Sequence, residues 1–212
     1  MKKDRNMLYG SLAFLAAFAV WTVLVCCVDV QTIGPEESSV GFAAVNGAFH
    51  NLTGVHWTLY TITDWLGLVP IGAALGFAVL GLVQLIQRKA LRKVDRSILA
   101  LGGFYLAVMA FYVLFEKAVV NYRPVLIEGV LEASYPSSTT MLALCVMPTA
   151  AMQLKARVRS GLARSVMLGM IAAFTAFLVF GRLLSGVHWL SDIVGGVLLS
   201  EGLVCAYAFA AE

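Results

Sequence analysis

A histidine and an aspartate stand four residues apart in the C-terminal part of the chain, as His188 and Asp192. Residues at i and i+4 share one face of a helix, so the two side chains can meet if a helix begins before His188. A carboxylate that bonds one imidazole nitrogen fixes the tautomer and leaves the other nitrogen free as a nucleophile. Arg182 lies six residues earlier, across a Ser-Gly turn, and its guanidinium can grip an anion with two hydrogen bonds. The alternative is an interfacial histidine that caps a helix, with Asp192 placed in the first turn by the helix dipole.

Two further polar clusters precede this one. The sequence Pro-Ser-Ser-Thr at 136–139 stands at a predicted helix start, where free backbone N–H groups and hydroxyls form a phosphate cradle. An ordinary helix N-cap would favour the same residue types. Upstream, Lys117 and Arg123 flank a predicted helix end, where they can hold phosphate or reach toward lipid headgroups.

The elements that must position these clusters are membrane helices. A spanning helix needs roughly 20 mostly apolar residues. Six stretches qualify, at 7–28, 66–87, 97–115, 137–154, 165–184 and 189–208. Residues 1–212 are therefore predicted to form one all-α domain, a six-transmembrane-helix bundle. The segment 31–65 contains no Lys or Arg and mixes apolar with aromatic residues, which is typical of an interfacial helical segment at the outer headgroups.

The basic residues predict the orientation of this bundle, because cytoplasmic loops are enriched in Lys and Arg. Twelve of the 15 basic residues fall before the first span, between spans two and three, or between spans four and five. With six spans, these groups share one face with both termini. We therefore expect a multi-pass protein of the cell membrane with cytoplasmic termini. Lys117, Arg123 and Arg182 remain on the opposite, extracytoplasmic face, together with the other polar clusters.

The composition favours lipid as the solvent. The chain is 60% hydrophobic and 13% charged, with a mean hydropathy of +0.87, whereas soluble domains are about 25% charged. The net charge of +3 is modest and explained by topology, so no nucleic acid partner is indicated. All four cysteines lie in apolar runs, without metal-ligand or disulfide spacing. The lipid bilayer is the partner that the composition predicts.

The three clusters together resemble the type 2 phosphatidic acid phosphatase family, which is related in fold to the vanadium-dependent haloperoxidases. Its signatures run Lys-x6-Arg-Pro, then Pro-Ser-Gly-His, then Ser-Arg-x5-His-x3-Asp. Arg182, His188 and Asp192 match the third signature at the same spacing, with Gly181 in place of the Ser. The order of the clusters, the six spans and the outward placement also agree with the family.

This resemblance implies a mechanism and a membrane lipid phosphate as substrate. His188 would attack phosphorus to form a phosphohistidine, oriented by Asp192. Cationic side chains and the cradle would hold the phosphoryl oxygens and stabilise charge in the transition state. The implied phosphate ligands are Lys117, Arg123, Arg182, Ser137, Ser138 and Thr139. The family implies neither a metal nor a cofactor.

Two departures from the signatures bear on that mechanism. Lys117 and Arg123 have five intervening residues instead of six, which displaces Lys117 by roughly 120° on a 3.6-residue helix. Glu116 has the family's spacing, but a carboxylate is a poor phosphate ligand. Thr139 stands where the family has the His that protonates the leaving group, and a hydroxyl is no general acid near neutral pH. Losing a general acid costs about 10²–10⁴-fold in rate, and less when the leaving group is itself a phosphate.

Three functional hypotheses follow. The favoured one is hydrolysis of a lipid diphosphate of the polyprenyl diphosphate type, because a phosphate leaving group needs the acid least. The second is hydrolysis of a lipid monophosphate, of the phosphatidic acid or phosphatidylglycerophosphate type, with a substitute acid. Candidate acids are His50, His56, Glu128 and Glu132. The third is a catalytically weakened protein that binds lipid phosphate. The lipid chain, the headgroup and the oligomeric state have no signature in the sequence.

Overall fold

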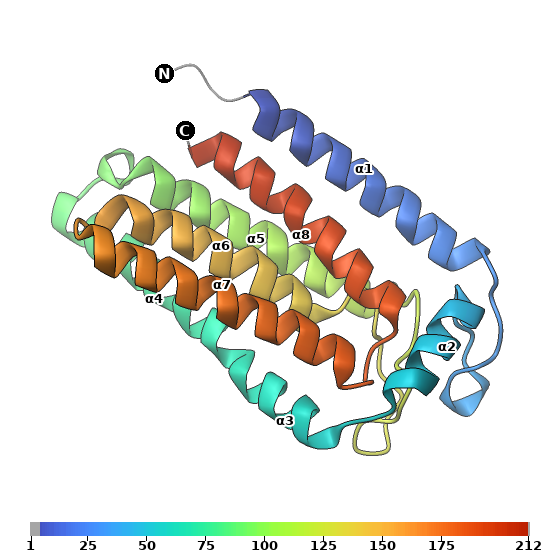
Figure 1. The fold of residues 1–212 in the computed structure, drawn as a ribbon. Coiled ribbons are helices and arrows are strands. Elements are labelled where there is room, and N and C mark those ends of the chain that lie inside the picture. Colours follow the sequence, from blue (N-terminus) through green and yellow to red (C-terminus); the bar gives the residue numbers. More distant parts are fainter. Residues whose placement is uncertain (1–4, 212) are drawn as a thin grey trace.

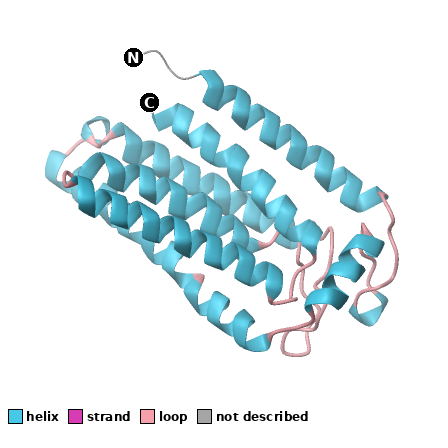
Figure 2. Ribbon diagram, viewed as in Figure 1, coloured by secondary structure: helices cyan, strands magenta, loops and turns pink. Residues whose placement is uncertain are grey.

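The computed structural model describes residues 5–211. Every regular secondary-structure element in these residues is a helix, which confirms the all-α class for this part of the chain (Figure 2). The helices are α1 (Arg5–Cys27), η1 (Pro35–Glu37), α2 (Ala43–Thr53), α3 (Trp57–Leu66), α4 (Leu68–Arg88), η2 (Leu91–Lys93), α5 (Arg96–Lys117), α6 (Ser138–Arg157), α7 (Gly161–Leu184) and α8 (Leu190–Ala211). The long helices run side by side, and α2 lies beyond their ends together with the longer loops (Figure 1).

Five helical stretches of residues 5–211 are long and apolar enough to cross a membrane: α1, the joined α3 and α4, α5, α7 and α8. They coincide with five of the six predicted spans, and the chain is a multi-pass membrane protein. The sixth predicted span coincides with α6, which has the length but not the apolar composition. Ten of the 20 residues in α6 are buried, whereas only two of the 21 in α4 are. Since protein surrounds α6, it can carry threonines that a lipid-facing helix would avoid, and its crossing of the membrane stays a prediction.

The predicted interfacial segment at 31–65 divides into two parts. η1 and α2 lie outside the bundle, as an interfacial segment would (Figure 1). α3 instead leads straight into α4, so that Trp57–Arg88 forms one apolar helical stretch with a single turn residue at Gly67. The sequence prediction was wrong on this point, because Asp64 and the aromatic residues of α3 obscured its continuity with the following span. α3 packs against α7 at the end of the bundle opposite the chain termini, and this contact brings α3 to the polar clusters.

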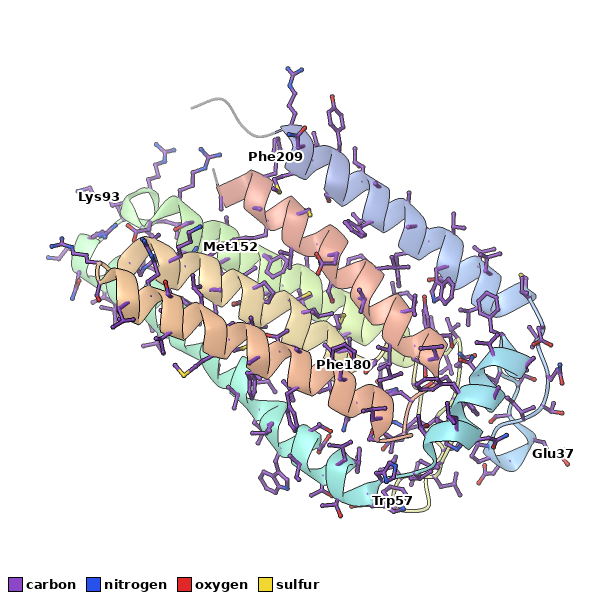
Figure 3. All side chains as sticks on the ribbon, viewed as in Figure 1. Glu37, Trp57, Lys93, Met152, Phe180 and Phe209 are labelled. Carbon is purple, nitrogen blue, oxygen red and sulfur yellow. The ribbon has the colours of Figure 1, made fainter. Side chains whose placement is uncertain are left out.

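The two ends of the bundle differ in composition. The basic turns after α4 and after α6 lie at the same end as both termini, and Figure 3 places Lys93 and Phe209 there, opposite Glu37 and Trp57. The N-terminal Lys2 and Lys3 fall outside the described residues. This arrangement agrees with the predicted topology, although the side on which the cytoplasm lies stays a prediction. We call the end that carries the termini the inner end, and the other end the outer end.

Candidate active site

His188 lies at the outer end, in the loop that joins α7 to α8. Gly186 in this loop has φ +72°, and a Cβ there would collide with the Gly54 carbonyl, so only glycine fits. The His56 amide donates a hydrogen bond to the Ser185 carbonyl at 2.9 Å, which fixes the loop against the segment before α3. His188 is 3% exposed. The loop therefore holds the imidazole in one buried position.

Asp192 follows in the first turn of α8 and is fully buried. Its Oδ2 lies 3.7 Å from His188 Nδ1, which brings the predicted pair together at a distance too long for a hydrogen bond. α8 begins only at Leu190, so the pair meets across the helix start instead of along one helix face. Asp192 Oδ2 accepts the Trp189 amide at 2.9 Å, and its Oδ1 accepts Asn121 Nδ2 at 3.1 Å. The carboxylate is therefore held by groups other than the histidine.

Arg123 approaches the other nitrogen of the imidazole. Arg123 Nη1 lies 3.2 Å from His188 Nε2, and because a guanidinium can only donate, Nε2 must be the unprotonated acceptor. Burial, with the charges of Arg123 and Arg182 added, lowers the pKa of His188 well below its usual value. The imidazole is therefore neutral, with the Nε2 lone pair directed at a cation that can also hold an anion.

Arg182 is the most enclosed cation of the outer end, with 2% exposure. Its Nη2 lies 3.2 Å from Asp64 Oδ1, its Nη1 is 3.4 Å from Thr63 Oγ1, and its guanidinium carbon is 4.8 Å from the centre of the Tyr60 ring. All three partners belong to α3. The Arg182 Nε has no hydrogen-bond partner. α3 therefore fixes this guanidinium at the outer end of α7 and leaves it one donor to spare.

The start of α6 contributes serines but not the threonine. The Ser137 amide donates to the Asp192 carbonyl at 3.1 Å, which joins α6 to α8, and the buried Ser137 hydroxyl has no hydrogen-bond partner. Ser138 lines a cavity with His188. Thr139 does not, and its methyl group lies against Gly67, at the junction of α3 and α4. The residue in the position of the family histidine thus faces away from the cavity.

The cavity beside His188 has a volume of about 220 Å³. The residues with polar or charged side chains that line it are Tyr112, Glu116, Arg123, Glu132, Ser134, Tyr135, Ser138 and His188. Lys117, a predicted phosphate ligand, is exposed at the end of α5 and does not line it. The shifted spacing seen in the sequence therefore has a structural consequence, because Glu116 faces the cavity and Lys117 does not.

A second, larger cavity of about 920 Å³ runs along α4, α5 and α6. Its walls are almost entirely apolar, and it extends from Leu91 and Val94 near the inner end to Tyr112 and Ser138 near the outer end. Tyr112 and Ser138 also line the smaller cavity. The two spaces therefore adjoin, one polar and beside His188, the other apolar and within the membrane region.

Several residues that position the side chains of the site were not predicted from the sequence. Asn121 lies two positions before Arg123, is 1% exposed and bonds Asp192. Asn46 of α2 donates to Ser191 Oγ at 2.9 Å and accepts its amide at 3.1 Å. A lone asparagine between apolar neighbours, such as Asn121, was a usable signal in the sequence. Asn46 and Asp64 were not recognisable, since their partners lie more than 100 positions away.

Metal-binding side chains do not gather at the site. No group of three or more His, Cys, Asp or Glu residues in positions 5–211 is arranged to hold a metal ion. The chemistry available to the described residues is therefore that of an imidazole, two guanidiniums, hydroxyls and carboxylates.

Both the sequence and the fold of this chain are similar to those of known proteins. The sequence profile of the PAP2 superfamily matches residues 103–211, which include His188, Arg123 and the start of α6. The fold is similar to the crystal structure of a transmembrane PAP2 type phosphatidylglycerolphosphate phosphatase from Bacillus subtilis, with a TM-score of 0.66 and 15% sequence identity. That match covers 94% of each chain. No curated protein matches the sequence significantly.

Proposed function

The chain belongs to the PAP2 superfamily, and from this premise we propose that it hydrolyses a lipid phosphate through a phosphohistidine on His188. The observation that carries the proposal is the 3.2 Å approach of Arg123 Nη1 to the unprotonated Nε2 of His188, beside a cavity of about 220 Å³. A neutral, buried imidazole next to a cation is suited to attack phosphorus. A bound phosphoryl group would receive hydrogen bonds from the same guanidinium.

The proposed reaction has two steps. In the first, Nε2 of His188 forms a bond to phosphorus while the bond from phosphorus to the leaving oxygen breaks. Asp192, 3.7 Å from Nδ1, stabilises the positive charge that develops on the ring. Arg123 and Ser138, which line the cavity, stabilise the negative oxygens. Arg182 and Ser137 do not line it, but they are buried with donors that have no partner and would assist. In the second step water hydrolyses the nitrogen–phosphorus bond. Lys117 has no part in this scheme, since it is exposed and does not line the cavity.

The apolar cavity supports a substrate with a hydrocarbon chain. A phosphate held beside His188 places the rest of its molecule near Tyr112 and Ser138, where the larger cavity begins. Apolar walls favour a chain over water by about 25 cal/mol per Å² of buried surface. We place the polar cavity at the extracytoplasmic side, since the basic turns lie at the opposite end of the bundle.

A lipid diphosphate remains the favoured substrate class. Thr139 faces away from the cavity, and His188 is the only histidine in residues 5–211 that lines it. A phosphate leaving group departs with less need for a proton than an alkoxide does. Hydrolysis of a monophosphate is the second candidate, because the similar fold belongs to a phosphatidylglycerolphosphate phosphatase.

The test compares two substrates with purified protein in detergent. Phosphate release is measured from a polyprenyl diphosphate and from phosphatidic acid, with His188→Ala as the control that must abolish both. A higher kcat/KM for the diphosphate supports the favoured class, and a clear preference for phosphatidic acid excludes it. Lipid-phosphate binding without His188-dependent turnover would leave a binding protein as the function.

A further inference from the structure

Glu116 occupies a position that is unusual for a phosphate site. It lies seven residues before Arg123, at the spacing where the family signature has lysine. Glu116 is exposed to solvent and is one of the residues that line the cavity beside His188 and Arg123. A carboxylate there repels a phosphate oxygen, so it weakens binding of the anion. A carboxyl group can, however, donate a proton, which the lysine it replaces does poorly near neutral pH.

The proposed reaction lacks a proton donor for an alkoxide leaving group. Thr139, in the position of the family histidine, lies against Gly67. Among the acids suggested by the sequence, His50, His56 and Glu128 do not line the cavity. The missing proton must come from a group that does.

Other proton donors in the cavity are already engaged. Glu132 Oε2 lies 3.0 Å from Arg123 Nε, so this carboxyl group is already paired with a cation. The Tyr135 hydroxyl shares a 2.7 Å hydrogen bond with Thr22, and burial raises the pKa of this phenol. The remaining donor, Tyr112, is a phenol, and phenols as a class are weaker acids than carboxylic acids. Glu116 has no ion pair among the residues that the structure describes.

We propose that Glu116 is the general acid of this site and replaces the histidine that the second signature lacks. This inference rests on the proposed phosphohistidine reaction and concerns its second candidate substrate class, the lipid monophosphates, whose alkoxide leaving group needs an acid. As the phosphorus–oxygen bond breaks, its electron pair goes to the leaving oxygen, which takes the proton of the Glu116 carboxyl. Water then breaks the nitrogen–phosphorus bond, and its proton returns to the Glu116 carboxylate.

The test examines the first step with two substrates whose leaving groups differ in their need for a proton. Two monoesters with comparable chains serve as probes: hexadecyl phosphate, which releases an alkoxide, and an alkyl-substituted nitrophenyl phosphate, which releases a stable nitrophenolate. Release of the alcohol or phenol is followed in a single turnover. In Glu116→Gln, release from hexadecyl phosphate should fall by about 10²–10⁴-fold, because the acid is lost. Release from the nitrophenyl ester should fall by less than about tenfold, because nitrophenolate departs without a proton.

The controls separate a catalytic role from a structural one. Glu37→Gln makes the same substitution at an exposed position of η1, also at the outer end, and should leave both rates unchanged (Figure 3). Glu116→Asp keeps the acid and should retain the wild-type ratio between the two esters. An unchanged ratio in Glu116→Gln, through equal loss or no loss on both esters, overturns the inference. Wild-type turnover that persists in His188→Ala would instead overturn the proposed function beneath it.

Discussion

Charged residues form one network at each end of the bundle, and the two networks differ in burial. At the inner end, Arg88 and Asp95 pair at 2.8 Å with about 40% of each side chain exposed. Arg157 lies 3.7 Å from the same carboxylate, and Gln84 donates to it at 2.8 Å. At the outer end, Arg182, His188 and Asp192 are at most 3% exposed.

The two networks also differ in how many of their polar atoms have hydrogen-bond partners. Both carboxylate oxygens of Asp95 accept hydrogen bonds, and its amide donates to Gln84. At the outer end, the buried Ser137 hydroxyl and Arg182 Nε have no partner. Buried polar atoms without partners cost about 1–3 kcal/mol each unless something binds them. The inner network therefore has its hydrogen bonds filled, whereas the outer one retains donors without partners, which the proposed phosphate would use.

The largest difference between the two networks is expected in covalent chemistry. His188→Gln removes the nucleophile but keeps a polar side chain, so lipid phosphate hydrolysis should fall to the background of the assay. Acid quenching of the wild type with radiolabelled substrate should trap an acid-labile phosphoenzyme, and the variant should yield none. A phosphoenzyme in His188→Gln would place the nucleophile elsewhere.

The same substitution in the two networks compares Arg123 at the outer end with Arg88 at the inner end. Arg123→Lys keeps the charge but loses the planar donors that face both His188 and the substrate, so kcat should fall by about 10²–10³-fold. Arg88→Lys makes the same change in the exposed inner network and should leave kcat within about twofold, since exposed ion pairs contribute little. Equal losses in the two variants would contradict the functional difference between the networks.

A smaller effect is expected from Asn121, which bonds Asp192 and does not line the cavity. Asn121→Ala removes the 3.1 Å hydrogen bond to Asp192 Oδ1. If the loss of this hydrogen bond raises the activation free energy by about 1.4 kcal/mol, kcat falls roughly tenfold. KM should change little. Steady-state kinetics of phosphate release measures both. A rise in KM alone would assign Asn121 to substrate binding.

The smallest effect is expected at Asp95. Hydrogen bonds from Arg88 and then Gln84 hold the pKa of this carboxyl below its ordinary 3.8. A lowered folded-state pKa means that the carboxylate stabilises the fold above the ordinary value and loses this contribution as pH falls through the folded value. Asp95→Asn should therefore lower stability by at most about 1 kcal/mol at pH 7. The Tm values of variant and wild type, measured in detergent, should converge as the pH falls below 3.8 and through the folded-state pKa, and a gap that widens in acid would contradict this assignment.

The sequence by itself determined the helical membrane class, five spans, the gathering of the basic turns with the termini, and the family. These features are local, because long apolar runs form helices in lipid and signature spacing is a property of the chain. His188, Asp192 and Arg123 were also predicted from spacing and chemistry, and the structure brings all three together.

Only the tertiary structure decided which side chains face the cavity. The shortened spacing before Arg123 already placed Lys117 in doubt, but the direction of α5 as it enters the outer loop selects Glu116 in its place. Thr139 turns toward Gly67, and Asp64 holds Arg182 from a helix 118 positions away in the chain. Helix rotation and long-range packing set these contacts, and a single sequence carries no local record of either.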